Sequence, residues 1–253
     1  MHFPLFLSPF ILPFLVWLPQ AFSKTLVSYS ASSGDPASNL GYLNLEKTKG
    51  DRPKVNSADL YIKTATDPSG VPAAHFHRKK GYRRTEYHSL FYATQYDTTY
   101  YIGYQVMIRK IRHNLVIFQW KELVKQSTQL IPLNLEFFSE HNERILTFNH
   151  EAPNSHTRTT FWNRTLKDGV KYSVGMVINT GTPGGEDGWA KLYWDGEPQK
   201  MFDGTDFING TMVSSQANPK FGAYRGEEFE IDTYVYAVKI GTASGDVKDV
   251  AGW

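Results

Sequence analysis

The sequence contains no cysteine, so disulfides cannot stabilise the fold. A chain of 253 residues is long enough to bury a sizeable apolar core without them. The formal net charge is only +2 at pH 7, which argues against a nucleic-acid-binding protein. No internal repeat, low-complexity tract or long apolar pattern of helical period is present, which excludes a helical bundle or a solenoid.

Lys, Arg, Asp and Glu are absent from residues 1–23, which are largely apolar and end in Ala21-Phe22-Ser23. The small residues at −3 and −1 from a cut before Lys24 are typical of a secretory signal peptide. The alternative is a membrane anchor. The four prolines of residues 1–23 argue against a membrane-spanning helix. The apolar run is also shorter than the roughly 20 residues that a span needs. We therefore expect a secreted, extracellular protein without a membrane contact once residues 1–23 are removed.

Two N-glycosylation sequons occur in the remaining chain, at Asn163-Arg164-Thr165 and Asn209-Gly210-Thr211. They fit a eukaryotic secretory route and a glycoprotein. We expect both asparagines to lie in exposed turns.

Residues 24–253 predict a single all-β domain. Segments rich in aromatic and β-branched residues are separated by turn signals of Gly, Asp, Asn and Pro. This pattern favours an antiparallel β-jelly-roll sandwich. The predicted strands are residues 100–108, 114–121, 133–139, 144–150, 157–164, 171–179, 190–196 and 228–241.

Three extended stretches carry polar side chains at alternate positions, which places them on one face of a strand. One interpretation is a solvated outer face; the other is the floor of a groove that binds an anion. Three strands with the same kind of polar face favour the groove. The residues are Arg84, Glu86 and His88; Gln119 and Lys121; and Lys220, Gly222 and Tyr224.

These stretches resemble motifs of family 7 alginate lyases, in order and in separation. Residues 84–88, RTEYH, are similar to R-[ST]-E-x-R; residues 118–121, FQWK, lie where those enzymes carry Q-[IV]-H; and residues 220–224 keep the spacing of K-A-G-x-Y. The chain departs from the pattern at His88, Lys121 and Gly226, which replace Arg, His and Gln. With the secretion signal and the ending DTYVYAVKIG, the whole mature chain resembles polysaccharide lyase family 20, the glucuronan lyases, more closely.

The resemblance implies β-elimination on a 1,4-linked polyuronate, β-1,4-glucuronan first, giving 4,5-unsaturated products. Tyr224 is expected to donate a proton to the leaving C4 oxygen, and either Tyr224 or His77 to take the C5 proton. Gln119 is expected to stabilise the enolate-like transition state. The expected substrate-binding residues are Arg84, Glu86, His88, Lys121 and Lys220, with Glu86 holding Arg84 or His88 in position. His75 shares a face with His77 if HFH is extended, and we expect one of them in a loop at the rim of the groove.

The chemistry itself needs no cofactor. Asp232 is predicted to belong to a structural calcium site, with Glu230 exposed. The expected partner is an acidic polysaccharide and not a nucleic acid, and the protein is expected to be a monomer.

Three other functions compete with the lyase. The strongest is a non-catalytic lectin, in which tryptophans 120, 162, 189 and 194 would stack on sugars, although most of these aromatics are more simply core. A glucanase is suggested by EID at residues 230–232, but its third acid would fall at Val235 and is missing. The basic stretch HRKKGYRR, residues 77–84, would permit nucleic-acid binding, against which secretion and the small net charge argue.

Overall fold

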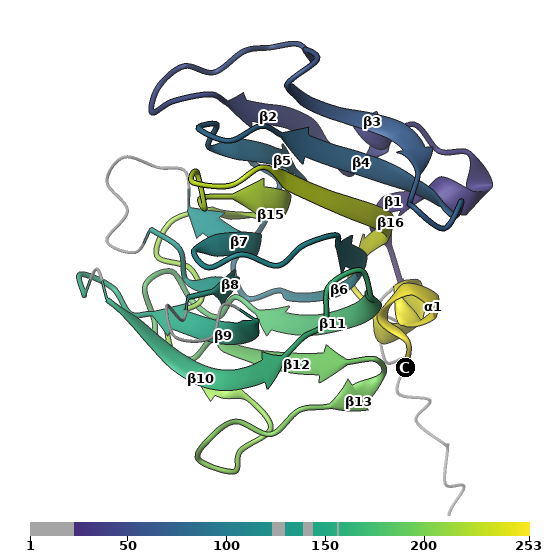
Figure 1. Cartoon of the computed structure of the whole chain (residues 1–253). Coiled ribbons are helices and arrows are strands. Elements are labelled where there is room, and N and C mark those ends of the chain that lie inside the picture. Colours follow the sequence, from purple (N-terminus) through teal and green to yellow (C-terminus); the bar gives the residue numbers. More distant parts are fainter. Residues whose placement is uncertain (1–22, 123–129, 139–143, 156) are drawn as a thin grey trace, which may run out of the picture.

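The computed structural model describes residues 23–122, 130–138, 144–155 and 157–253. The predicted signal peptide lies outside the described residues, except for Ser23. Two antiparallel sheets face each other, as the side-by-side layers of Figure 1 show. The prediction of an all-β sandwich of the jelly-roll type is confirmed.

One sheet, here called sheet A, has the strand order β13-β12-β11-β6-β16-β4-β3, with β1 beside β16 and β14 beside β12. Alternation of apolar and polar residues makes one of its faces apolar, and that face turns toward the other sheet. Its strands are β1 (Thr25–Ser30), β3 (Leu60–Thr66), β4 (Pro72–Arg78), β6 (Thr99–Ile108), β11 (Lys171–Asn179), β12 (Trp189–Trp194), β13 (Glu197–Pro198), β14 (Ile208–Asn209) and β16 (Ile231–Gly241).

The second sheet, sheet B, has the order β10-β9-β8-β7-β15-β5-β2. A short helix, α1 (Lys248–Ala251), follows the last strand of sheet A. The strands of sheet B are β2 (Tyr42–Glu46), β5 (Arg84–His88), β7 (Leu115–Glu122), β8 (Leu133–Phe137), β9 (Ile145–Glu151), β10 (Arg158–Thr165) and β15 (Ala217–Tyr224).

The hydrophobic core lies between the two sheets. Phe76 of β4 meets Tyr87 of β5 edge to face, with ring centroids 6.2 Å apart. Phe118 and Trp120 of β7 are fully buried in the same core. Trp162 and Trp194 are also buried there, so these three tryptophans are not exposed sugar-stacking platforms.

All eight predicted strands are confirmed, with ends that differ by a few residues. Strands β1 to β4, β13 and β14 were not predicted. Asn163 and Asn209 are exposed, but they lie in β10 and β14, so the expectation of turns is wrong for both. No helix among the described residues is long and apolar enough to cross a membrane.

Candidate functional site

Residues 75–88, which include the basic stretch 77–84, are divided between the two sheets. Strand β4 ends at Arg78 in sheet A, and β5 begins at Arg84 in sheet B. Because Phe76 and Tyr87 both face the core, the side chains next to them in each strand point to the outside. The histidines of β4 and the polar residues of β5 therefore lie on opposite outer faces of the sandwich, whose two layers are visible in Figure 1.

Strand β15 joins the three predicted motifs in sheet B, because it pairs with β5 on one side and with β7 on the other. Lys220 lies opposite His88 of β5 and opposite Gln119 of β7. Tyr224 lies opposite Arg84. Residues that are far apart in sequence thus form one polar cluster on the outer face of sheet B, as the sequence predicts.

Gly222 permits the close approach of β15 and β5. It has a φ of +136°, which disfavours any residue with a side chain. A Cβ atom at this position would lie 2.2 Å from the carbonyl oxygen of Thr85 and 2.9 Å from the ring of Phe76. The regular pairing of β15 with β7 is also interrupted between Phe221 and Tyr224. The glycine and this irregularity together set where Tyr224 lies relative to Lys220.

Glu86 lies at the centre of the cluster and is fully buried. Its carboxylate is 3.3 Å from Nε of Arg84 and accepts a hydrogen bond from Nε2 of Gln119. Arg84 makes a second ion pair, at 3.2 Å, with Glu46. Glu86 therefore contacts Arg84, as expected, but the structure shows no contact with His88.

Gln119 is 0% exposed and does not line the groove. One of its amide N–H groups is already used by Glu86. The expected role of this amide, stabilisation of the enolate-like transition state, is not supported by its burial. Gln119 instead holds the Glu86 carboxylate, which in turn holds Arg84.

His88 is a neutral imidazole of defined tautomer. The amide Nδ2 of Asn44 donates to its Nε2 at 2.8 Å, so the ring proton is on Nδ1. Burial, together with the charges of Lys220 and Arg84, lowers the pKa of His88 to about 2. Within the described part of the chain Nδ1 has no hydrogen-bond partner, although it is buried. Such a donor is suited to a ligand.

Lys220 is 1% exposed, and its ammonium group is held among like charges. Burial lowers its pKa to about 7; the carboxylate of Glu86 opposes this shift, while Arg84 and Lys121 add to it. Burial also lowers the pKa of Lys121, whose Nζ donates to the carbonyl of Leu130 at 3.1 Å. A second negative charge near these amines would favour their charged form.

Tyr224 is surrounded by guanidinium groups. Arg83 donates to its hydroxyl oxygen at 3.1 Å, which leaves the hydroxyl hydrogen available for another acceptor. The guanidinium carbon of Arg84 lies 4.2 Å from the ring centroid, and those of Arg83 and Arg225 lie at 5.4 and 5.6 Å. A negative charge that develops on this oxygen would therefore be stabilised by its neighbours.

Arg78, the last residue of β4, holds the chain just before β5 and directly after Tyr224. Its fully buried guanidinium donates to the carbonyls of Tyr82 and Arg225, and at 3.3 Å to that of Gly226. Arg225 has a φ of +63°, in the left-handed region that arginine seldom adopts. Arg78 thus fixes the irregular backbone directly after Tyr224.

A cavity of about 450 Å³ opens over the cluster. Six lysines and arginines line it, against two glutamates, so it favours an anion. Its lining residues are Asn44, Glu46, Lys49, Arg52, Arg83, Arg84, His88, Lys121, Glu122, Leu130, Lys220 and Tyr224.

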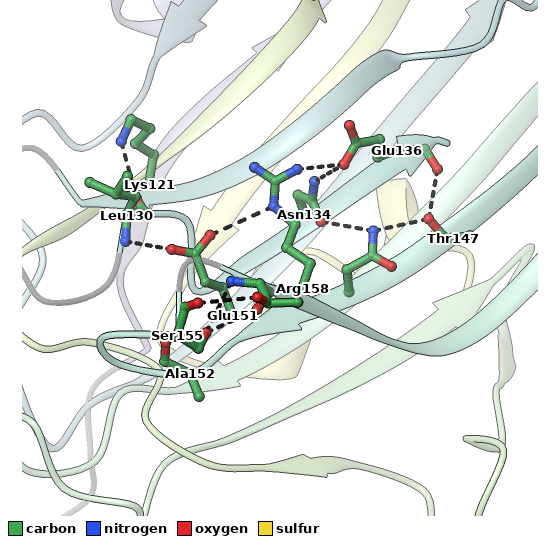
Figure 2. A network of polar contacts seen from close by, with 11 residues as sticks. Lys121, Leu130, Asn134, Glu136, Thr147, Glu151, Ala152, Ser155 and Arg158 are labelled. Carbon is green, nitrogen blue, oxygen red and sulfur yellow. Dashed lines mark hydrogen bonds and ion pairs between the residues drawn. The ribbon is translucent and has the colours of Figure 1, made fainter. Parts of the chain in front are cut away.

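The polar face continues across the neighbouring strands of sheet B, as Figure 2 shows. Arg158 of β10 bridges Glu136 at 2.7 Å and Glu151 at 3.7 Å. The backbone N–H of Leu130 donates to Glu151, and Lys121 donates to the carbonyl of Leu130. The network thus connects the cationic cavity with β8, β9 and β10.

His77 is not part of this cluster. It lies in strand β4 of sheet A, not in a loop, and its Nδ1 is 2.8 Å from Oδ1 of Asp232. His75 Nε2 lies 2.7 Å from the same oxygen. The expectation that one of these histidines borders the groove of Tyr224 is wrong, because the two sheets separate them.

The surroundings of Asp232 do not favour calcium. Burial raises the pKa of Asp232, but hydrogen bonds from His75 and His77 outweigh it and lower that pKa to about 2, so the carboxylate is ionised. Glu230 is exposed, as predicted. The groups nearest the carboxylate are imidazole nitrogens and the guanidinium of Arg109, whereas calcium prefers oxygen ligands.

Among the hydrogen-bond and ion-pair partners of Arg84, His88 and Tyr224, three were not anticipated from the sequence: Asn44, Glu46 and Arg83. Asn44 and Glu46 alternate with Leu43 and Leu45 in β2, a pattern that indicates a strand with one polar face. Arg83 precedes β5, and the sequence pattern does not place it in the groove, because strict alternation puts its side chain on the opposite face from that of Arg84.

No protein-family profile matches the chain, and no curated protein matches it in sequence. Solved structures do resemble it. Alginate lyase A1-II′, a member of polysaccharide lyase family 7, is 12% identical with a TM-score of 0.56, over 80% of this chain and 95% of its own. The endo-β-1,4-glucuronan lyase from the fungus Trichoderma reesei is 14% identical with a TM-score of 0.51, over 82% and 97%.

The fold is not confined to lyases. Domain 4 of AbnA, a GH43 extracellular arabinanase from Geobacillus stearothermophilus solved with arabinotriose, is 13% identical with a TM-score of 0.52, over 90% of this chain and 98% of its own. At such identities the likeness shows the fold alone. The chain therefore has a fold found in polysaccharide lyases, and its function has to be argued from the side chains of the groove.

Proposed function

We propose that this protein is a polysaccharide lyase of the glucuronan lyase type, which cleaves a 1,4-linked polyuronate, first of all β-1,4-glucuronan, by β-elimination. The observation that carries the proposal is the Tyr224 hydroxyl at the edge of a cationic cavity, beside Arg84 and Lys220. The fold shared with a glucuronan lyase and an alginate lyase supports it.

The carboxylate of the sugar is the group that these cations would bind. Loss of the C5 proton places a second negative charge on an already anionic sugar, so positive groups near the carboxylate lower the barrier. Arg84 is held in place by Glu46 and Glu86, and Lys220 and Lys121 line the same cavity. The free Nδ1–H of His88 would supply a neutral donor to the same carboxylate.

The proton transfers fall to Tyr224. His88 cannot act as the base through Nε2, because that atom already accepts from Asn44. His75 and His77 lie in the other sheet. Of the tyrosine and the histidines considered as the base, Tyr224 is the one that remains. As the phenolate, which the guanidinium groups around its ring would stabilise, Tyr224 would take the proton from C5. The hydroxyl formed in this way would then give that proton to the C4 oxygen, as the C4–O bond breaks and the C4=C5 double bond forms.

The length of the polar face suits a polymer. A second cavity of about 460 Å³ lies over β8, β9 and β10 and is lined by Glu136, Glu151 and Arg158. Arg225, which follows Tyr224 directly, also lines it. Neighbouring sugars of one chain would occupy the two cavities, with the reacting bond next to Tyr224.

The proposal is tested by mixing the purified protein with polyglucuronate, alginate, mixed uronans and neutral glucans. We expect the ultraviolet absorbance of a 4,5-unsaturated product to rise with polyglucuronate and to stay flat with neutral glucans, which offer these cations no carboxylate. Binding of uronans without any rise would indicate a lectin. Cleavage of a neutral glucan without unsaturation would indicate a hydrolase, and either result would refute the proposal.

A His77→Gln variant tests the assignment of the base. Since His77 lies on the opposite outer face from Tyr224, we expect kcat/KM on the uronan to stay within about twofold of wild type, as for substitutions at distant sites. Steady-state rates on folded protein provide the measurement. A loss of several orders of magnitude would return His77 to the mechanism and remove Tyr224 as the base.

The cellular context is part of the proposal. We expect the protein to be secreted after removal of residues 1–23, to act as a monomer without a cofactor for the elimination itself, and to carry glycans at Asn163 and Asn209, whose side chains are exposed. Protein secreted from a eukaryotic host should lose mass on enzymatic deglycosylation. An unchanged mass would contradict the glycan assignment.

A further inference from the structure

The outer face of sheet A carries a second cluster with a different chemistry. His75 and His77 of β4 and Asp232 of β16 each offer one ligand atom, and these atoms all lie within 4.8 Å of one another. Within the described residues no other group of His, Cys, Asp and Glu converges in this way. The imidazole nitrogens His75 Nε2 and His77 Nδ1 lie 2.7 and 2.8 Å from a single oxygen, Oδ1 of Asp232.

The backbone builds this cluster without any loop. His75 and His77 are two positions apart in β4, so both point to the outside while Phe76 between them packs in the core. Asp232 is paired in register with His77 in the neighbouring strand. Three ligand atoms on two hydrogen-bonded strands need little ordering when an ion binds.

The rings are also held in orientation. The Tyr234 ring stacks on His75 with centroids 4.5 Å apart, and the Tyr61 ring stacks on His77 at 4.9 Å. The Tyr61 hydroxyl lies 3.4 Å from Nδ1 of His75, the nitrogen that does not face Asp232. A partner at the second ring nitrogen is the arrangement that fixes the tautomer of a metal-bound histidine.

We propose that His75 Nε2, His77 Nδ1 and Asp232 Oδ1 form a binding site for one divalent ion of the zinc class. Two imidazoles and one carboxylate, with a fourth position left to water, are a donor set that zinc uses in proteins. Hard cations such as calcium and magnesium prefer oxygen ligands instead. This inference does not depend on the proposed lyase activity.

An ion would change the spacing of the three ligand atoms. Bonds of roughly 2.0–2.2 Å to a tetrahedral ion place neighbouring ligand atoms about 3.3–3.6 Å apart. The imidazole nitrogens, now 2.7 and 2.8 Å from Oδ1, would therefore move away from it by about 0.5–0.9 Å. Both histidine side chains are 16% exposed, so solvent reaches the site.

The ion pair between Arg109 and Asp232 leaves Oδ1 of Asp232, the third ligand atom, accessible to the ion. Arg109 pairs at 3.4 Å with Oδ2 of Asp232, the oxygen that the histidines do not use, and its side chain is 60% exposed. Asp232 also borders a cavity of about 510 Å³ whose lining includes Lys80, Arg109 and Lys110. The ion's fourth position would hold water or a small anion.

The test uses the full chain without a polyhistidine tag, freed of metal with a chelator. Titration with zinc chloride in a calorimeter should show one saturable site, and the melting temperature should rise with zinc concentration, because only the folded state presents the three ligands together. An equal concentration of calcium chloride should give neither effect. Absence of a saturable zinc site in wild type would overturn the proposal.

Variants identify the ligands. His77→Gln and Asp232→Asn should each weaken zinc binding by about 100-fold or more, and Tyr61→Phe by about 10-fold, the range for loss of an outer partner. His113→Gln, a histidine outside the cluster that contacts Phe229, is the matched control and should bind as wild type. Equal affinity in wild type and both ligand variants would place the ion elsewhere and refute the proposal.

A measurement on wild type alone covers the case in which a ligand variant does not fold. The imidazole nitrogen signals of His75 and His77 should shift together in a nuclear magnetic resonance titration with zinc, while those of His113 stay in place. Shifts confined to other histidines would contradict the assignment.

Discussion

Replacing Tyr224 by phenylalanine is expected to lower kcat on polyglucuronate by about 10²–10⁴-fold, the contribution of general acid–base catalysis. The change removes the single hydroxyl that would carry the proton from C5 to the C4 oxygen. Arg84 keeps its ion pairs with Glu46 and Glu86, so the carboxylate of the sugar is still bound and KM should change little. Initial rates from the absorbance of the unsaturated product measure the effect.

The fold of the Tyr224→Phe variant should be almost unaffected. Only the hydrogen bond from Arg83 is lost, which corresponds to about 1 kcal/mol of unfolding free energy. Tyr193→Phe, in β12 of sheet A, removes a hydroxyl far from the groove and serves as the control. A folded Tyr224→Phe protein with near-wild-type kcat would exclude Tyr224 from the proton transfers and leave the proposed mechanism without an acid.

Lys220→Met is expected to lower kcat by about 10²–10³-fold, as when one preorganised partner of a developing negative charge is removed. In the free wild-type enzyme the ammonium is lost as pH rises through about 7, so kcat/KM should fall over that range. The residual activity of the variant should lack this decrease. A pH–rate profile for each protein makes the comparison, and an identical decrease in both would refute the role of Lys220.

Lys220 also makes the free energy of unfolding depend on pH. Its pKa is about 7 in the folded protein, against an ordinary 10.5, so between these values the unfolded chain binds more protons. The free energy of unfolding therefore rises with pH in this window, by up to about 1.4 kcal/mol per pH unit. Denaturant unfolding of Lys220→Met should show a flatter profile, whereas Lys191→Met in sheet A should follow wild type.

A profile for Lys220→Met that is as steep as wild type would mean that Lys220 keeps an ordinary pKa in the folded protein. Its ammonium would then stay charged at neutral pH, and the predicted decrease in kcat/KM would need another cause.

Much of the groove could be predicted because strand alternation is a local property. Arg84 and His88, or Lys220 and Tyr224, fall on one face of a strand wherever that strand lies in the fold. In β7, the apolar residues Phe118 and Trp120, which alternate with Gln119 and Lys121, indicate in the same way which face is buried. The pattern of each strand was sufficient to group these residues, and the structure shows the strands next to one another.

What could not be predicted depends on pairing between distant strands. Residues 79–83 carry the chain from one sheet to the other, and nothing in their composition distinguishes this crossing from a hairpin turn within one sheet. His77 was therefore placed beside residues that lie on the opposite face. The hydrogen bond from Gln119 to Glu86 likewise joins two strands that lie on either side of β15, and no single strand reveals it.

Strand β4 serves both outer surfaces of the protein at once. His75 and His77 point outward from sheet A, while Arg78, at the next inward position, holds the backbone directly after Tyr224 and that of Tyr82. A substitution at one of these positions changes one surface and leaves the other in place. An insertion or deletion of a single residue in β4 would instead exchange inside and outside, so that a histidine entered the core and Arg78 left it. A change in the length of β4 would therefore disturb both outer surfaces at once.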